Sequence, residues 1–153
     1  MENNAASKLT PQSPIWLRTF VETYQILSTD NLNLLASIYH TNILFIDPMH
    51  KVEGLDELYK YFNSLYSNLS RCQFVIDNIV TQGDEAALYW TMTYQHHKLN
   101  KGDVVTVQGS SYIKGHNDKV IYHRDYLDLG AMLYEQLPLF GKLIKWIKKH
   151  ASK

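Results

Sequence analysis

Apolar positions in the first half of the chain recur at helical spacing. Five apolar residues from Leu17 to Leu27 follow the i, i+3, i+4, i+7, i+10 spacing, which places them on one face of a helix. A proline directly after Ser13 marks the start of this helix, because proline is tolerated at the first helical position. The same period predicts a short helix over residues 32–39 and a third helix over residues 55–69.

The second half of the chain alternates between apolar and polar positions from Cys72 onward, as strands with one buried face do. Turn sequences rich in glycine, asparagine and aspartate divide it into four segments, which predicts the hairpins of an antiparallel sheet. An earlier strand, residues 43–46, ends at Asp47-Pro48, because proline cannot continue a hydrogen-bonded ladder. Helices followed by strands indicate an α+β domain, with the helices laid on one face of a curved sheet.

The last segment, residues 139–153, has five lysines and no acidic residue. Its apolar residues recur at helical spacing, so it is predicted to be a basic amphipathic helix. We expect its apolar face to pack on its own domain or on a second copy, with an anionic membrane surface as the alternative. The organisation is then a loosely ordered N-terminus (1–13), one α+β domain (14–138) and this helix (139–153).

Composition narrows the class of protein. With 153 residues, 45% hydrophobic and 20% charged, the chain matches one globular domain. Fifteen basic and fifteen acidic residues balance, which argues against a nucleic-acid partner. A single cysteine, Cys72, excludes an internal disulfide, and no stretch approaches the ~18 consecutive apolar residues of a membrane span. We therefore expect a cytoplasmic protein.

A few polar residues lie on the predicted buried face of a strand or directly after the end of a strand. His123 and Asp125 share a strand face with apolar neighbours, where a carboxylate is costly to bury and often marks a functional site. Asp47 follows the short strand, at a place where functional side chains gather. The structural alternatives are an ion pair for Asp125, with Arg124 or another base, and a plain turn for Asp47. The histidines lack metal-ligand spacing, so we expect no metal and no cofactor.

The order of elements and one motif resemble a known superfamily. Two helices, a short strand ending in Asp-Pro, a third helix and a long curved sheet resemble the nuclear-transport-factor-2-like superfamily, over about Trp16 to Leu139. The most specific stretch is DKVIYHRDYLDL, Asp118 to Leu129, which looks like the last strand of limonene epoxide hydrolases and SnoaL-like polyketide cyclases. The resemblance implies a cone-like sheet that wraps the N-terminal helices and encloses a pocket, and it implies a homodimer.

The resemblance also suggests roles by position. Asp125 matches a catalytic aspartate of the epoxide hydrolases, whose arginine and second aspartate are replaced by Met92 and Tyr94. Asp47 matches the proton-shuttling aspartate of ketosteroid isomerases. At the positions that stabilise the enolate in those isomerases, the nearest matches are Tyr24 and Ser110. One acid of each enzyme type is present without the full set of either.

These observations predict a protein that binds a small hydrophobic or polycyclic molecule in a central pocket. One hypothesis is proton transfer leading to isomerisation or cyclisation, with Asp47, Asp125 and His123 as catalytic candidates. The other is a ligand-binding or protein-association module without turnover. The residues expected to contact the ligand are Tyr24, Phe45, Phe62, Trp90, Met92, Tyr94 and Ser110.

Overall fold

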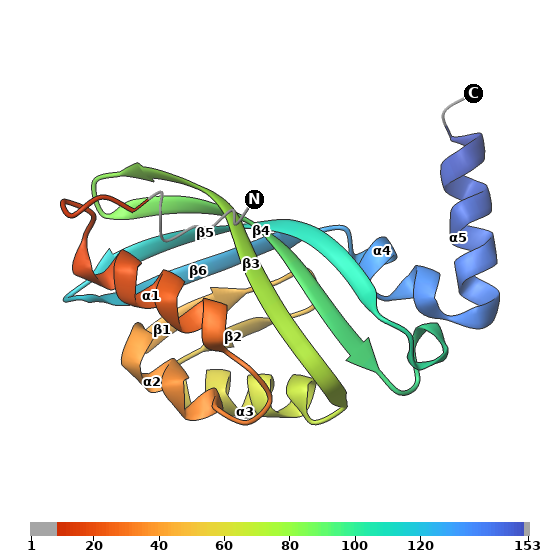
Figure 1. Ribbon diagram of the computed structural model, residues 1–153, viewed down its shortest axis with the longest axis horizontal. Helices are drawn as coiled ribbons and strands as arrows, with labels where there is room; N and C mark the ends of the chain where they lie inside the picture. Colours follow the sequence, from red (N-terminus) through yellow and green to blue (C-terminus); the bar gives the residue numbers. More distant parts are fainter. Residues whose placement is uncertain (1–8, 152–153) are drawn as a thin grey trace.

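A computed structural model describes residues 9–151 and places a six-stranded sheet against helices from the first half of the chain (Figure 1). The helices are α1 (Ile15–Ile26), α2 (Leu35–Ile38), α3 (Leu55–Tyr66), α4 (Leu129–Met132) and α5 (Pro138–His150), with single 3-10 turns η2 (Leu32–Leu34), η3 (Asn100–Gly102) and η4 (Tyr134–Gln136). The strands are β1 (Tyr39–Ile46), β2 (Lys51–Glu53), β3 (Leu69–Gln82), β4 (Glu85–His96), β5 (Val105–His116) and β6 (Lys119–Leu127). This is the α+β order that the sequence pattern predicts.

The sheet is curved and open, with strand order β2-β1-β6-β5-β4-β3. The hairpins are antiparallel as predicted, whereas β1 and β6 run parallel, so the sheet is mixed. Asn117 and Asp118 connect β5 to β6 with φ of 48° and 60°. A tight two-residue hairpin needs positive φ at both positions, and asparagine and aspartate tolerate it.

Helices α1 and α3 cover one face of the sheet (Figure 1). Helix α1 contacts β3, β5 and β6, and α3 contacts β1 and β3. The predicted stripe of α1, from Leu17 to Leu27, is the buried one. The alternation predicted for β4 is also confirmed, because Leu88 and Trp90 are buried while Tyr89 between them is exposed. The inner sheet face and the two helices therefore enclose the core.

Two tryptophan rings lie against glycines of the sheet. A Cβ atom on Gly109 would be 2.3 Å from the ring of Trp90, and one on Gly115 would be 2.3 Å from the ring of Trp16. Neither ring could stay in place beside a larger residue. Because Trp90 reaches the site described below, Gly109 helps to position that site.

Some element boundaries differ from the prediction. Strand β1 begins at Tyr39 rather than at residue 43, because the polar segment His40–Asn42 hides its period. Strand β2 is too short to show a period. Residues 1–8 of the predicted loose N-terminus lie outside the described residues, but Leu9 packs against the core and Thr10–Ser13 form a hydrogen-bonded turn.

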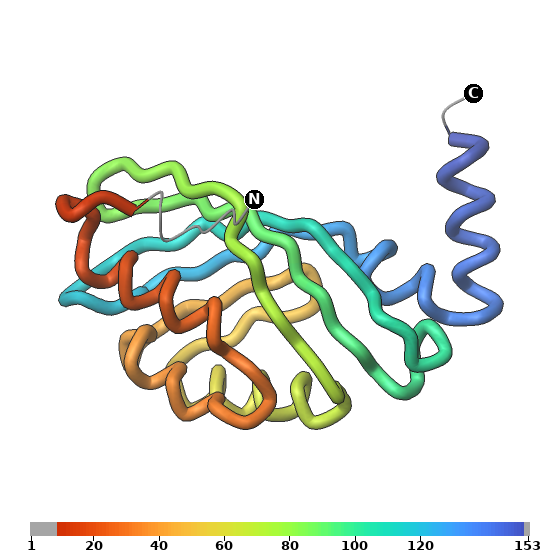
Figure 2. The backbone as a smooth tube through the Cα atoms, in the orientation of Figure 1, coloured from red at the N-terminus to blue at the C-terminus, as the bar shows by residue number. Residues whose placement is uncertain are grey.

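Helix α5 stands away from the sheet and from the other helices (Figure 2). Its main contacts are with η4. The apolar side chains of Leu139, Phe140 and Trp146 are exposed. The apolar side of α5 therefore does not cover its own domain, the first of the two expected positions, because the chain turns away at Leu137 and the helix side that faces the domain carries Gly141 and Lys148.

Candidate functional site

A cavity of about 390 Å³ lies between the inner sheet face, α1, α3 and α4. Its wall is mostly apolar, and Leu129, Met132 and Leu133 form the side next to α4. Cavities of this size and character take small molecules. Eight residues predicted from the sequence line it, namely Tyr24, Phe45, Asp47, Phe62, Trp90, Met92, Tyr94 and Asp125.

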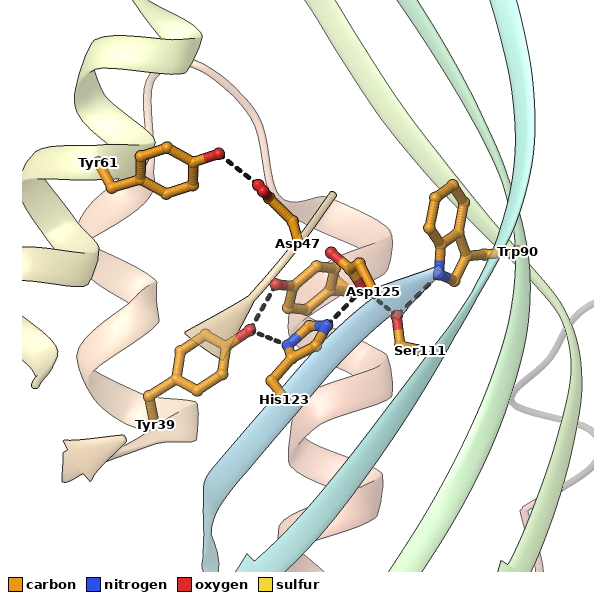
Figure 3. Close-up of polar contacts among 8 residues, drawn as sticks. Tyr39, Asp47, Tyr61, Trp90, Ser111, His123 and Asp125 are labelled. Carbon is orange, nitrogen blue, oxygen red and sulfur yellow. Dashed lines mark hydrogen bonds and ion pairs between the residues drawn. The ribbon is translucent and has the colours of Figure 1, made fainter. Parts of the chain in front are cut away.

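Asp125 lies on β6, with its carboxyl group at the cavity wall (Figure 3). Its Oδ1 accepts a hydrogen bond from Ser111 Oγ at 2.5 Å and lies 2.7 Å from His123 Nε2. Ser111 in turn accepts a hydrogen bond from Trp90 Nε1 at 2.8 Å. Among residues 9–151, none donates to Oδ2 of Asp125, so this oxygen is available to a molecule in the cavity.

His123 connects Asp125 to two buried tyrosines. Its Nδ1 lies 2.6 Å from the hydroxyl of Tyr39, which lies 2.5 Å from the hydroxyl of Tyr24. Because a carboxylate only accepts, His123 donates from Nε2 to Asp125 and accepts at Nδ1 from Tyr39. Tyr39 then accepts from Tyr24, and every donor of this four-residue network points toward Asp125.

Burial keeps the two tyrosines of the network protonated. Desolvation, and after it the charge of Asp125, raises the pKa of Tyr24 above its ordinary range. Burial and the neighbouring Tyr24 raise the pKa of Tyr39 in the same direction. His123 is 1% exposed, does not line the cavity and packs against the ring of Phe20. It is thus placed to orient Asp125 rather than to touch a ligand.

Asp47 holds the turn that leads from β1 to β2. Its Oδ1 accepts hydrogen bonds from the backbone N–H groups of Met49 and His50, both at 2.7 Å. Its Oδ2 accepts a hydrogen bond from the hydroxyl of Tyr61. Asp47 lines the same cavity as Asp125, but both of its oxygens have protein partners, Oδ1 in the turn that its Asp-Pro context indicates and Oδ2 on α3.

Two further tyrosines border the cavity. The hydroxyl of Tyr94 donates to the carbonyl of Met132, which ties β4 to α4, and burial raises the pKa of Tyr94 to about 12. The Sγ of Cys72 donates to the hydroxyl of Tyr66 at 3.7 Å, and burial raises the pKa of that thiol to about 11. Within the described chain the hydroxyl hydrogen of Tyr66 has no acceptor, so it can serve a ligand.

Tyr39→Phe is expected to lower the free energy of unfolding by about 1–3 kcal/mol. The substitution leaves His123 Nδ1 and the hydroxyl of Tyr24 buried without their partner. Urea denaturation measures the change. Tyr59→Phe, which alters an exposed side chain on α3, is the matched control and should stay within about 0.5 kcal/mol of the wild type. Equal stability of the two variants would contradict the buried network.

The description "SnoaL-like domain" belongs to a sequence family whose profile matches residues 18–123, more than half of the chain. The chain belongs to the SnoaL-like family. No curated protein matches it in sequence. The family assignment agrees with the resemblance noted in the last strand and with the curved sheet around α1.

Solved structures share the fold of this SnoaL-like chain at low sequence identity. A proposed SnoaL-like polyketide cyclase from Jannaschia sp. CCS1 is 17% identical, with a TM-score of 0.70 over 82% of this chain and 93% of that one. A proposed polyketide cyclase from Acidithiobacillus ferrooxidans is 15% identical, with a TM-score of 0.69 over 85% and 99%. A protein of ketosteroid isomerase-like fold from Catenulispora acidiphila, in complex with trimethylamine, is 13% identical, with a TM-score of 0.69 over 85% and 96%. At these identities the likeness concerns the fold.

The SnoaL-like site corrects one residue expected at the ligand. Ser110 lies outside the cavity, because β5 turns Val105, Val107 and Ser111 to the inner face. Ser110 pairs instead with the exposed Tyr89 on the outer face. Val105 and Val107 are the sequence feature that identifies the inner face of β5. Continuing their alternation along the strand places Ser111, and not Ser110, on that face. Sequence reasoning missed Tyr39 and Tyr66 altogether, since nothing local links them to the site.

Proposed function

We propose that this SnoaL-like protein binds a small, largely apolar molecule in the cavity and transfers a proton on it with Asp125. The observation that carries the proposal is the carboxyl group of Asp125 at the cavity wall, with Oδ1 held by Ser111 and His123 and Oδ2 left for the ligand. A general base must be fixed in orientation and within reach of the proton that it takes. Asp125 meets the first condition through two hydrogen bonds.

The groups around the cavity suggest the reaction class. A base beside an apolar wall suits removal of a proton from a carbon next to a carbonyl, the first step of an isomerisation or a ring closure. Tyr66 supplies a hydroxyl that can donate to the resulting enolate oxygen. Burial, and after it the neighbouring thiol of Cys72, raises the pKa of Tyr66, which keeps it a donor.

His123 and Tyr39 act as positioning residues in this proposal. When Oδ2 of Asp125 takes the proton, Oδ1 keeps its hydrogen bonds from Ser111 and His123. The base therefore changes charge without losing its orientation, and it can return the proton to a second carbon of the same ligand. An isomerisation needs this return to carbon, whereas a ring closure by attack of the enolate on a carbonyl returns the proton to the alkoxide oxygen that forms.

Binding without turnover is the second candidate function. Among the described residues that line the cavity there is no lysine or arginine, and both oxygens of Asp47 have protein partners. This lining favours an uncharged ligand, and a carrier of apolar molecules would satisfy it as well as an enzyme. Measuring proton transfer on a bound ligand distinguishes the enzyme from the carrier.

Met92→Trp is expected to weaken ligand binding by filling the cavity, because Met92 is a lining residue on the inner face of β4. Titration with an apolar fluorescent dye, followed by displacement with polycyclic ketones, measures the affinity. We expect at least about tenfold weaker dye binding in the variant. Thr93→Trp adds the same ring on the outer face of the same strand and should bind as the wild type does. Wild-type affinity in Met92→Trp would rule out this cavity as the ligand site.

A further inference from the structure

Helix α5 stands apart from the sheet (Figure 2), and nothing in the described chain covers its apolar side. Leu139, Phe140 and Trp146 are 83%, 60% and 58% exposed, and Leu143 and Ile147 are also exposed. Leu139, Leu143 and Trp146 follow the i, i+4, i+7 spacing of one helix face. Exposed apolar patches of this kind on an otherwise polar surface mark interaction sites.

The structure fixes which side of α5 faces outward. Gly141 lies so close to η4 that a Cβ atom there would be 2.2 Å from the carbonyl oxygen of Glu135. Two turns further along, Lys148 Nζ binds Asp128 Oδ2 and Glu135 Oε1, both at 2.6 Å. Gly141 and Lys148 are seven residues apart and so share one face. Both contacts hold that face against the domain, and the apolar side is turned away from it.

The charge of α5 points to an anionic partner. Residues 139–153 supply five of the fifteen basic residues and none of the fifteen acidic ones, so residues 1–138 carry a net charge of −5. Lys142 and Lys145 are exposed on the helix. Two copies that met through α5 alone would bring both sets of lysines together with no acid in the helix to offset them.

We propose that α5 binds the surface of an anionic phospholipid bilayer. Its apolar side, with Trp146, enters the boundary between headgroups and acyl chains, and Lys142 and Lys145 contact lipid phosphates. No helix in residues 9–151 is long and apolar enough to cross a membrane, so α5 lies in the plane of the surface. Because Lys148 of α5 binds Asp128, the N-cap residue of α4, and α4 lines the cavity, binding holds that cavity wall next to the bilayer.

Flotation of the full-length protein with vesicles tests the proposal. The two preparations are pure phosphatidylcholine and an equal mixture of phosphatidylcholine and phosphatidylglycerol, each at low and at physiological salt. We expect binding to the mixed vesicles that weakens as salt rises, and little binding to the neutral ones. Binding should also shift the fluorescence of Trp146 to shorter wavelength, because Trp16 and Trp90 are already buried.

Two pairs of variants test the lysines of α5 and its apolar side separately. The double variant K142Q/K145Q should bind mixed vesicles about 30-fold more weakly, whereas K51Q/K60Q removes the same charge from β2 and α3 and should bind normally.

Leu139→Ser should bind about tenfold more weakly, with Val80→Ser, at an exposed apolar site on β3, as its control. All four variants change exposed side chains, so circular dichroism should show the wild-type fold.

Two results would overturn the proposal. One is the failure of the wild type to float with the mixed vesicles at low salt, or flotation of K142Q/K145Q equal to that of the wild type. The other is a dimer in sedimentation velocity without lipid that Leu139→Ser dissociates, together with no flotation. That second result assigns the apolar side of α5 to a second copy of the chain.

Discussion

Asp125→Asn is expected to lower the rate of proton transfer by about 10²–10⁴-fold while leaving ligand affinity nearly unchanged. The amide has the shape of the carboxyl group but cannot serve as a base. Its Oδ1 can still accept from Ser111 and His123, so the cavity wall should keep its form. The measurement is deuterium incorporation from D₂O into a ketone that displaces the dye from the cavity.

Two further variants are needed to interpret the result for Asp125→Asn. Asp103→Asn makes the same change at an exposed position near η3 and should exchange at the wild-type rate. Asp47→Asn tests the other aspartate of the cavity and should keep measurable exchange, because its carboxylate serves the turn. Full exchange activity in Asp125→Asn, or its loss only in Asp47→Asn, would show that Asp125 is not the base.

Phe20→Ala is expected to lower the free energy of unfolding by about 3–5 kcal/mol. Phe20 is 2% exposed and packs on three members of the network, with ring centroids 4.4 Å from Tyr24, 5.9 Å from Tyr39 and 5.6 Å from His123. Removing the ring leaves a cavity where α1 meets β1 and β6. The loss combines the transfer free energy of the ring with the cost of that cavity.

Urea denaturation of Phe20→Ala and Ile15→Ala makes the comparison within one helix. Ile15 is 56% exposed at the start of α1, so its truncation should change stability by less than about 0.5 kcal/mol. The packing described around Phe20 is incorrect if the two variants unfold at the same urea concentration.

The sequence pattern predicted those parts of the fold in which one period is long and unambiguous. The stripe of α1 runs over three turns and the alternation of β4 over twelve residues, so chance matches are few. In β5 the run Gly109-Ser110-Ser111 interrupts the alternation, and the inner face could be assigned only from the valines before it. That interruption is why the wrong serine was expected at the site.

The remaining parts of the site depend on contacts between distant segments. The hydroxyl of Tyr39 reaches His123 across 84 positions of sequence, and Asp125 meets Ser111 from a neighbouring strand. No local pattern encodes either contact. The sequence pattern does not place α5 for the same reason, because an amphipathic stripe can cover its own domain, a second copy or a lipid surface.

The parallel pairing of β1 with β6 affects the order in which the protein can fold during synthesis. Strand β1 is made early, but its partner ends at Leu127, near the end of the domain. Until β6 has left the ribosome, one edge of β1 stays unpaired and His123 cannot meet Tyr39. Contacts of such long sequence separation slow folding, and unpaired strand edges favour aggregation. A nascent chain that stops before β6 should therefore lack both the closed core and the proposed active site.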